Sequence, residues 1–169
     1  GVYYVLVQGR SGSADTPVTI TAEALPFSVL DVAVDQGGDS RWVTATITGA
    51  RFAPEAIVKL VRPGLAELEP VRYEVVDATT IIATFDLRNL PHGLYDVAVV
   101  NPGGAIASLP YRYLIETALP IDVTIGLGGP RVVPAGQTGL YSISLQSLTN
   151  VDTPYVYFTF GAPELGENA

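Results

Sequence analysis

The sequence contains no cysteine and a single histidine, His92, among its 169 residues. The absence of cysteine excludes disulfide bonds, thiol nucleophiles and zinc sites that use cysteine ligands. One histidine cannot build a zinc site alone, and a catalytic base here would have to act from the Pro91-His92-Gly93 turn. We therefore interpret His92 as an exposed turn residue. A chain without cysteine fits a bacterial surface protein and an intracellular protein equally well.

Positive charge is also scarce. The chain has nine Lys and Arg residues against 17 Asp and Glu residues, which gives a net charge of −8 and a pI near 4.4. Nucleic acids and anionic membranes both attract clustered basic residues, so we expect neither as a partner. No apolar run approaches the ~18 residues of a membrane-spanning helix, so no membrane insertion is expected. Lys59 is the only lysine, a bias typical of GC-rich bacterial genomes.

Recognisable catalytic motifs are missing as well. The run Gly9-Arg10-Ser11-Gly12-Ser13 lacks the closing glycine and the following helix of a nucleophile elbow. Residues 126–131 do not form a dinucleotide-binding fingerprint, because proline and arginine replace the residues that would open a helix. Glu67 and Glu69 are best interpreted as part of a solvated acidic loop. We expect no enzymatic activity, no catalytic residues and no cofactor.

The chain consists instead of short apolar runs separated by turns. Hydrophobic residues make up 48% of the sequence, and 13 prolines and 17 glycines interrupt them. The runs are rich in Val, Ile, Thr and Tyr, which predicts an all-β protein. In the segment 91–104, Tyr95, Val97 and Val99 point to one face of a strand. The Asn-Pro-Gly-Gly sequence that follows reverses the chain.

This segment, together with the upstream run Thr46-Ile47-Thr48-Gly49-Ala50-Arg51-Phe52, resembles the "ItGxxF … GxYdVxVxNpgG" pattern of IPT/TIG modules. The resemblance implies an immunoglobulin-like β-sandwich over residues 27–116, with a middle loop, Leu65–Pro70, longer than the pattern needs. Strands are expected at Ser28–Val34, Trp42–Thr48, Ala56–Arg62, Val71–Val76, Thr80–Asp86, Leu94–Val100 and Ala105–Leu114. One shared core is predicted for Val43, Ile47, Phe52, Ile82, Tyr95, Val97 and Val99.

The two ends of the chain resemble parts of other bacterial modules. Residues 1–26 hold strand candidates at Val2–Gln8 and Pro17–Ala22 and are similar to the end of pre-peptidase C-terminal domains. Residues 117–169 are similar to the start of cell-adhesion-related surface repeats. In this last block, strands are expected at Ile121–Leu127, Gly139–Leu148 and Tyr155–Phe160. The sandwiches either follow one another in tandem, or the central one is inserted between halves of a second. In both cases we expect a piece of a longer chain, because no initiator Met or signal peptide is present.

Two groups of residues are candidate binding sites. Asp31, Asp35 and Asp39 flank Gly37 and Gly38 and could supply oxygen ligands to calcium, which needs six to eight of them. Three carboxylates spaced by four seldom converge, so a charged surface turn is the favoured interpretation.

Aromatic residues form the second candidate group. Trp42, Tyr73 and Tyr111 could stack on sugar rings if they share an exposed face. Trp42 and Tyr95 are instead interpreted as packing residues, because aromatic side chains in sandwiches are more often core anchors. Tyr111 and Tyr113 have the same parity on the last strand, so at least one of them is expected to be buried.

These observations predict a non-catalytic structural or interaction module of a large secreted or cell-surface bacterial protein, such as a stalk, spacer or adhesin segment. Its partners would be neighbouring β modules of the same chain and a protein or glycan ligand on a surface. The alternative is a carbohydrate-binding accessory module of a polysaccharide-degrading enzyme, which would require coplanar exposed aromatics.

Overall fold

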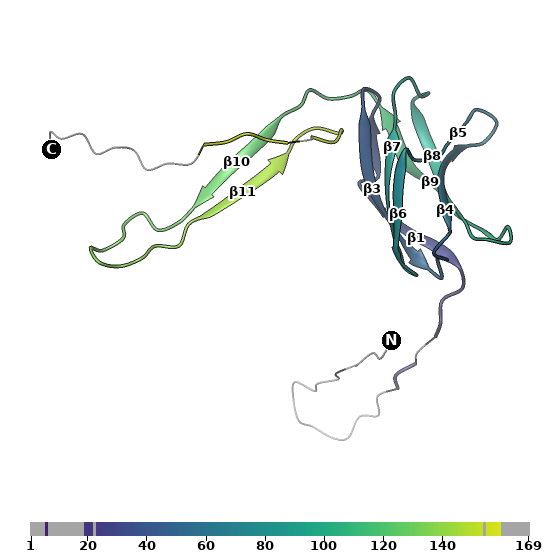
Figure 1. Cartoon of the computed structure of the whole chain (residues 1–169), viewed down its shortest axis with the longest axis horizontal. Helices are drawn as coiled ribbons and strands as arrows, with labels where there is room; N and C mark the ends of the chain where they lie inside the picture. Colours follow the sequence, from purple (N-terminus) through teal and green to yellow (C-terminus); the bar gives the residue numbers. More distant parts are fainter. Residues whose placement is uncertain (1–5, 7–18, 22, 154, 160–169) are drawn as a thin grey trace.

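The computed structural model describes residues 6, 19–21, 23–153 and 155–159. The described part of the chain is all-β, as the sequence predicts, with eleven strands and no helix (Figure 1). The candidate strand Val2–Gln8 lies outside the described residues except for Leu6, and Pro17–Ala22 lies partly outside them. The described residues 19–21 are not in a strand.

Nine strands form two sheets that share one core. The first sheet has the order β1-β3-β7-β6, with β1 Ser28–Ala33, β3 Trp42–Ala50, β7 Thr80–Asp86 and β6 Arg72–Asp77. The second has the order β2-β9-β8-β4-β5, with β2 Gln36–Gly38, β9 Ile106–Glu116, β8 Gly93–Val100, β4 Ile57–Arg62 and β5 Ala66–Leu68. Neighbouring strands are antiparallel except β2 and β9, which are parallel.

The core lies between the two sheets and follows from the period-two alternation of the strands. In β3, Val43, Ala45 and Ile47 are buried, whereas the intervening threonines are only half-buried. The buried cluster comprises Val29, Val32, Val43, Ala45, Ile47, Phe52, Ala56, Val58, Leu60, Ile81, Ala83, Phe85, Leu87, Tyr95, Val97, Val99, Ala107, Tyr113, Ile115 and Val151. Facing sheets that bury alternate residues form a β-sandwich.

The predicted core is wrong at one position. Ile82 is 40% exposed, and its neighbour Ile81 is buried instead. The register explains the exchange, because Ile81 pairs with the buried Ile47 of β3. Two adjacent isoleucines fit either face of a strand, so alternation alone cannot choose between them. The interpretation of Trp42 as a packing residue is also wrong, since its side chain is exposed.

A bulge in the middle of β9 separates Tyr111 from Tyr113. The pairing between β8 and β9 shifts between Tyr95 and Val97, and Tyr111 has a φ of 52°. The extra residues turn Tyr111 to solvent and leave Tyr113 in the core. This confirms the prediction that at least one of these two tyrosines is buried.

The last two strands, β10 Val123–Gly128 and β11 Ser142–Ser147, form a separate two-stranded ribbon. Figure 1 shows this ribbon extending away from the sandwich. The predicted strand Tyr155–Phe160 is wrong over its described part, because residues 155–159 form no strand; Phe160 lies outside the described residues.

Candidate functional site

The most elaborate set of polar contacts lies where the ribbon joins the sandwich. Residues 148–153, here called the junction segment, leave β11 and pack against the end of the sandwich. The peptide N–H of Gly38 donates to the carbonyl oxygen of Asn150 at 2.8 Å. A Cβ on Gly38 would lie 2.6 Å from both Ala118 and the side-chain oxygen of Asn150. Glycine is therefore required at position 38 for this close approach.

The side chain of Asn150 connects the junction segment to residues 116–119, the segment in which the chain leaves β9. Its oxygen accepts from the N–H of Leu119 at 2.8 Å. Its Nδ2 donates to Oε1 of Glu116 at 3.0 Å and to the carbonyl oxygen of Thr117 at 3.1 Å. Asn150 is buried, and these bonds satisfy both donors of its amide. A buried amide with this set of partners fixes the path of the chain.

Asp152 attaches the junction segment to β3. Its N–H donates to the carbonyl oxygen of Trp42 at 3.0 Å. Its carboxylate accepts from the N–H of Thr44 at 2.9 Å and from the hydroxyl of Thr44 at 2.6 Å. The register of β1 with β3 ends at the pair Ala33–Thr46. Asp152 therefore occupies the edge of β3 that β1 leaves free when the chain crosses to the other sheet.

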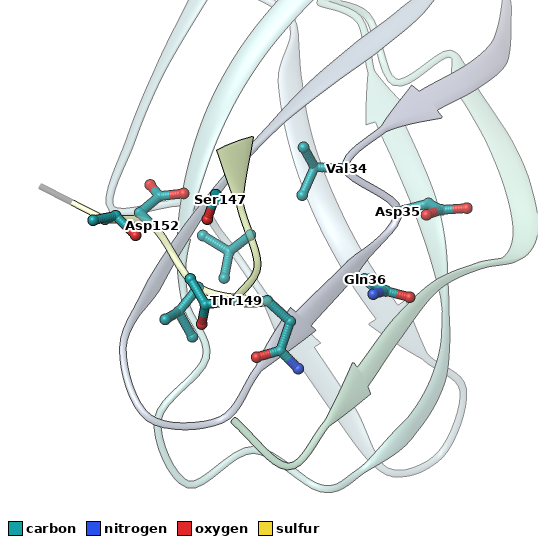
Figure 2. A pocket seen from close by; sticks show the side chains of 10 residues that line it. Val34, Asp35, Gln36, Ser147, Thr149 and Asp152 are labelled. Atoms are coloured by element: carbon teal, nitrogen blue, oxygen red, sulfur yellow. The ribbon is translucent and has the colours of Figure 1, made fainter. Parts of the chain in front are cut away.

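A hollow of about 610 Å³ lies between the junction segment and the turn from β1 to β2 (Figure 2). Val34 in this turn has a φ of 60°, a strained conformation for a β-branched residue. In Figure 2, Asp35 points away from the junction segment. The carboxylate of Asp35 instead contacts Arg112, at 3.2 Å. The two carboxylates lining this hollow thus already have protein partners, Arg112 for Asp35 and Thr44 for Asp152.

Tyr113 is buried beside this region. Its hydroxyl has no hydrogen-bond partner among the described residues, and a Cβ on Gly37 would lie 2.7 Å from it. Burial raises the pKa of Tyr113, and the negative charges of Asp152 and Asp35 raise it further. The phenol is therefore neutral at physiological pH and acts as a packing group.

The structure does not bring the three candidate calcium ligands together. Asp31 and Asp35 both bind Arg112, with Asp31 at 2.9 Å. Asp39 instead lies 2.8 Å from Nε2 of His92 and accepts from the N–H of Ala118. Bonding to Arg112 lowers the pKa of Asp31, and bonding to His92 lowers that of Asp39. Within the described residues, no three His, Cys, Asp or Glu side chains are grouped closely enough to hold a metal ion.

The three candidate carbohydrate-binding aromatics are exposed but do not share a face. Trp42 stands on the outer side of the first sheet, in register with Asp86. Tyr73 on β6 pairs with the buried Ala83, which places it on the core-facing side of the edge strand. Tyr111 belongs to the other sheet. The coplanar platform that sugar stacking requires is therefore not formed by these residues.

The remaining candidate groups also have structural partners. Lys59 contacts Glu67 at 2.6 Å and Glu69 at 3.0 Å. These two carboxylates raise the pKa of Lys59. Because Lys59 lies between them, the acidic pair is part of an ion-pair network on the outer side of the second sheet. Such exposed pairs contribute little to stability.

Sequence reasoning missed the residues that form the junction. The run Asn150-Val151-Asp152-Thr153-Pro154 lies between two predicted strands and carries turn-forming residues, so the sequence pattern indicates nothing more than a turn there. The signal that could have singled it out is the pair of Asn and Asp residues flanking Val151, which is buried. Their partners lie far away in sequence, so local pattern could not reveal them.

Comparison with known proteins finds no protein-family model and no curated protein that matches the chain. Nothing in the described part of the chain is a helix long and apolar enough to cross a membrane.

Proposed function

We propose that the chain is a non-catalytic structural and interaction module of a large secreted or cell-surface bacterial protein, in which it serves as a stalk, spacer or adhesin segment. We further propose that its sandwich is immunoglobulin-like and of the IPT/TIG type. The support comes from the strand order, from one tyrosine contact and from the path of the chain through the sandwich.

The strand order supports the immunoglobulin-like assignment. In the first sheet, the neighbouring strands β1, β3, β7 and β6 correspond to strands A, B, E and D of that fold. In the second sheet, β9, β8 and β4 correspond to strands G, F and C. The hydroxyl of Tyr95 on β8 donates to the carbonyl oxygen of Pro91 at 2.8 Å. A tyrosine near the start of strand F that bonds back to the backbone just upstream is a feature of these sandwiches.

The observation that carries the stalk proposal is the fixed exit of the chain. The described chain enters the sandwich where Ser28 pairs with Ala50, at one end of β3. It leaves β9 where Glu116 pairs with Gly38, near the opposite end. Asn150 and Asp152 then fasten the following ribbon to that end. Modules that enter and leave at opposite ends can be joined serially, and a bonded junction limits bending between them.

Distance measurements between spin labels test the fixed junction. The chain has no cysteine, so Thr46→Cys on the sandwich and Gln146→Cys on the ribbon would carry the only labels. We expect a narrow distance distribution for this pair. The additional changes Asn150→Ala and Asp152→Ala should broaden it, because they remove the junction hydrogen bonds. A broad distribution before these changes would contradict the proposal.

Replacement of the module in its parent protein tests the spacer role. Deletion of residues 27–116 should reduce surface adhesion, whereas replacement by an unrelated sandwich of equal length should preserve it. Loss of adhesion in the replacement would indicate a specific ligand instead. Binding of the isolated protein to glycans, abolished by Trp42→Ala, would favour the carbohydrate-binding alternative.

A further inference from the structure

The ribbon formed by β10 and β11 has two chemically different faces. Directly paired residues of an antiparallel ribbon lie on the same face. The register therefore places five large apolar residues on one side, here called the apolar face: Val123, Ile125, Leu127, Ile143 and Leu145. The opposite face carries only small or polar residues: Thr124, Gly126, Gly128, Ser142, Ser144 and Gln146.

The apolar face is open to solvent. Ile125, Leu127, Ile143 and Leu145 are 41–65% exposed. A two-stranded ribbon is at best marginally stable alone, and a contiguous exposed apolar face marks a contact surface. Strands whose faces divide in this way normally bury the apolar side against a second sheet about 10 Å away.

We propose that the apolar face is the inner face of a second β-sandwich, and that a β-sheet from the continuation of the same polypeptide covers it. This inference rests on the proposed function, in which sandwiches follow one another. Neither strand of the ribbon contains a charged residue. The chemistry of the face therefore fits an uncharged sheet of alternating Val, Ile, Leu and aromatic residues.

The size of the face favours a covalently connected partner over a second copy. Each six-residue strand is about 20 Å long and about 4.8 Å wide, so the two strands together form a face of roughly 200 Å² in projection. A stable interface between separate molecules buries about 800 Å² on each partner. A sheet in the same polypeptide needs no such area, because the connection gives it a high effective concentration.

The residues after the junction segment are consistent with this partner. Tyr155, Tyr157 and Phe158 are exposed, and the rings of Tyr155 and Tyr157 meet edge to face at 5.2 Å between centroids. The chain thus continues past the ribbon with further aromatic residues that the described part of the protein leaves uncovered. Within the described residues, the outer edges of β10 and β11 pair with no other strand, so they offer backbone groups to additional strands.

Hydrogen exchange tests the proposal on two lengths of the polypeptide. In residues 1–169, the amides of 123–128 and 142–147 should exchange rapidly, and the apolar face should bind bis-ANS. In the parent polypeptide extended beyond residue 169, we expect these amides to exchange at least ~100-fold more slowly and the dye to be excluded. Equal exchange in both lengths, or a parent chain without further strands, would overturn the proposal.

Matched substitutions separate the two faces. In the extended polypeptide, Leu127→Ser on the apolar face should restore rapid exchange of the ribbon, whereas Ser144→Thr on the polar face should leave it slow. The same response to both changes would overturn the proposal. A dimer of residues 1–169 that Leu127→Ser dissociates would also overturn it and identify a second copy as the partner. Because adhesion does not enter these measurements, their outcome is independent of the module-replacement experiment.

Discussion

The carboxylate of Asp152 accepts both the backbone N–H and the hydroxyl of Thr44, at 2.9 and 2.6 Å, across 108 residues of sequence. The Thr44 hydroxyl also lies 3.0 Å from that of Thr84. Asp152→Ala should leave the N–H of Thr44 without its hydrogen-bond partner. This loss is costly because the N–H is partly buried. We expect a loss of about 1–3 kcal/mol in the free energy of unfolding, measured by urea denaturation.

Asp122→Ala is the matched control for Asp152→Ala. Asp122 stands at the base of the ribbon, where its exposed carboxylate accepts, among the described residues, only from the neighbouring N–H of Val123. Its removal should change the free energy of unfolding by no more than about 0.5 kcal/mol. Equal losses for both variants would show that the Asp152 contact does not stabilise the junction.

Tyr95 combines complete burial with a hydrogen bond to the carbonyl oxygen of Pro91. Tyr95→Phe removes only the hydroxyl and should lower the free energy of unfolding by about 1 kcal/mol. Tyr95→Ala also removes the ring and should cost about 3–5 kcal/mol. Tyr111→Phe, at an exposed tyrosine on the neighbouring strand, should have almost no effect in the same denaturation experiment. An unchanged denaturation midpoint for Tyr95→Ala would mean that Tyr95 does not anchor the core.

Gly103 lies in the turn between β8 and β9 with a φ of 90°. No atom in the described part of the chain lies within 4 Å of the position that a Cβ would take, so steric contact is not the obstacle to a side chain there. The obstacle is the backbone conformation, which a β-branched side chain resists. Gly103→Val should therefore cost roughly 1–3 kcal/mol in the free energy of unfolding. Thr46→Ser, on the outer side of β3, should cost less. Equal thermal stability of these two variants would remove the conformational explanation.

Much of the sandwich could be predicted because its strands alternate clearly. All ends of the seven strands predicted in residues 27–116 fall within two residues of those observed. Strands β2 and β5 were missed because three residues are too few to show a period, and Gln36-Gly37-Gly38 has low β propensity. β2 depends on pairing with β9, which is distant in sequence, and β5 depends on pairing with β4 across a short turn.

The sequence indicates which residues have side chains of the type that binds a ligand, but it does not indicate where the fold places those side chains. Asp31, Asp35 and Asp39 lie four apart, yet the first two face Arg112 and the third faces His92. Arg112 and His92 lie far from them in sequence, so nothing local indicated that the carboxylates were already paired. The same reason hides the contact between Asp152 and Thr44.

Calcium is expected to have little effect on stability. Arg112 binds one oxygen of Asp31 and one of Asp35, so calcium would have to compete with its positive charge, and the two carboxylates alone supply too few oxygens for calcium. Thermal melting with millimolar calcium and with EDTA should therefore give similar midpoints. A site that binds at ~100-fold below the free calcium level would add about 2.7 kcal/mol. A rise of several degrees that EDTA reverses, and that Asp31→Asn abolishes, would contradict this prediction.

Asp86 should make folding stability depend on pH in the acid range. Hydrogen bonding to Arg88, whose Nε lies 2.8 Å from Oδ1, lowers the pKa of Asp86 from 3.8 to about 2 in the folded protein. The folded state therefore favours the ionised carboxylate. Its contribution to stability is fully present above pH 4, near the unfolded pKa, and is lost as the pH falls toward 2.

The pH dependence can be isolated by comparison with Asp86→Asn. Other carboxylates with lowered pKa values, including those of Asp31 and Asp39, remain in both proteins and contribute equally. The difference in free energy of unfolding between the two proteins should thus be constant above pH 4 and shrink between pH 4 and 2. Arg88→Ala should flatten the curve in the same way, because Arg88 is the main cause of the shift. Parallel curves for wild type and Asp86→Asn down to pH 2 would show that the ion pair does not distinguish the folded from the unfolded state.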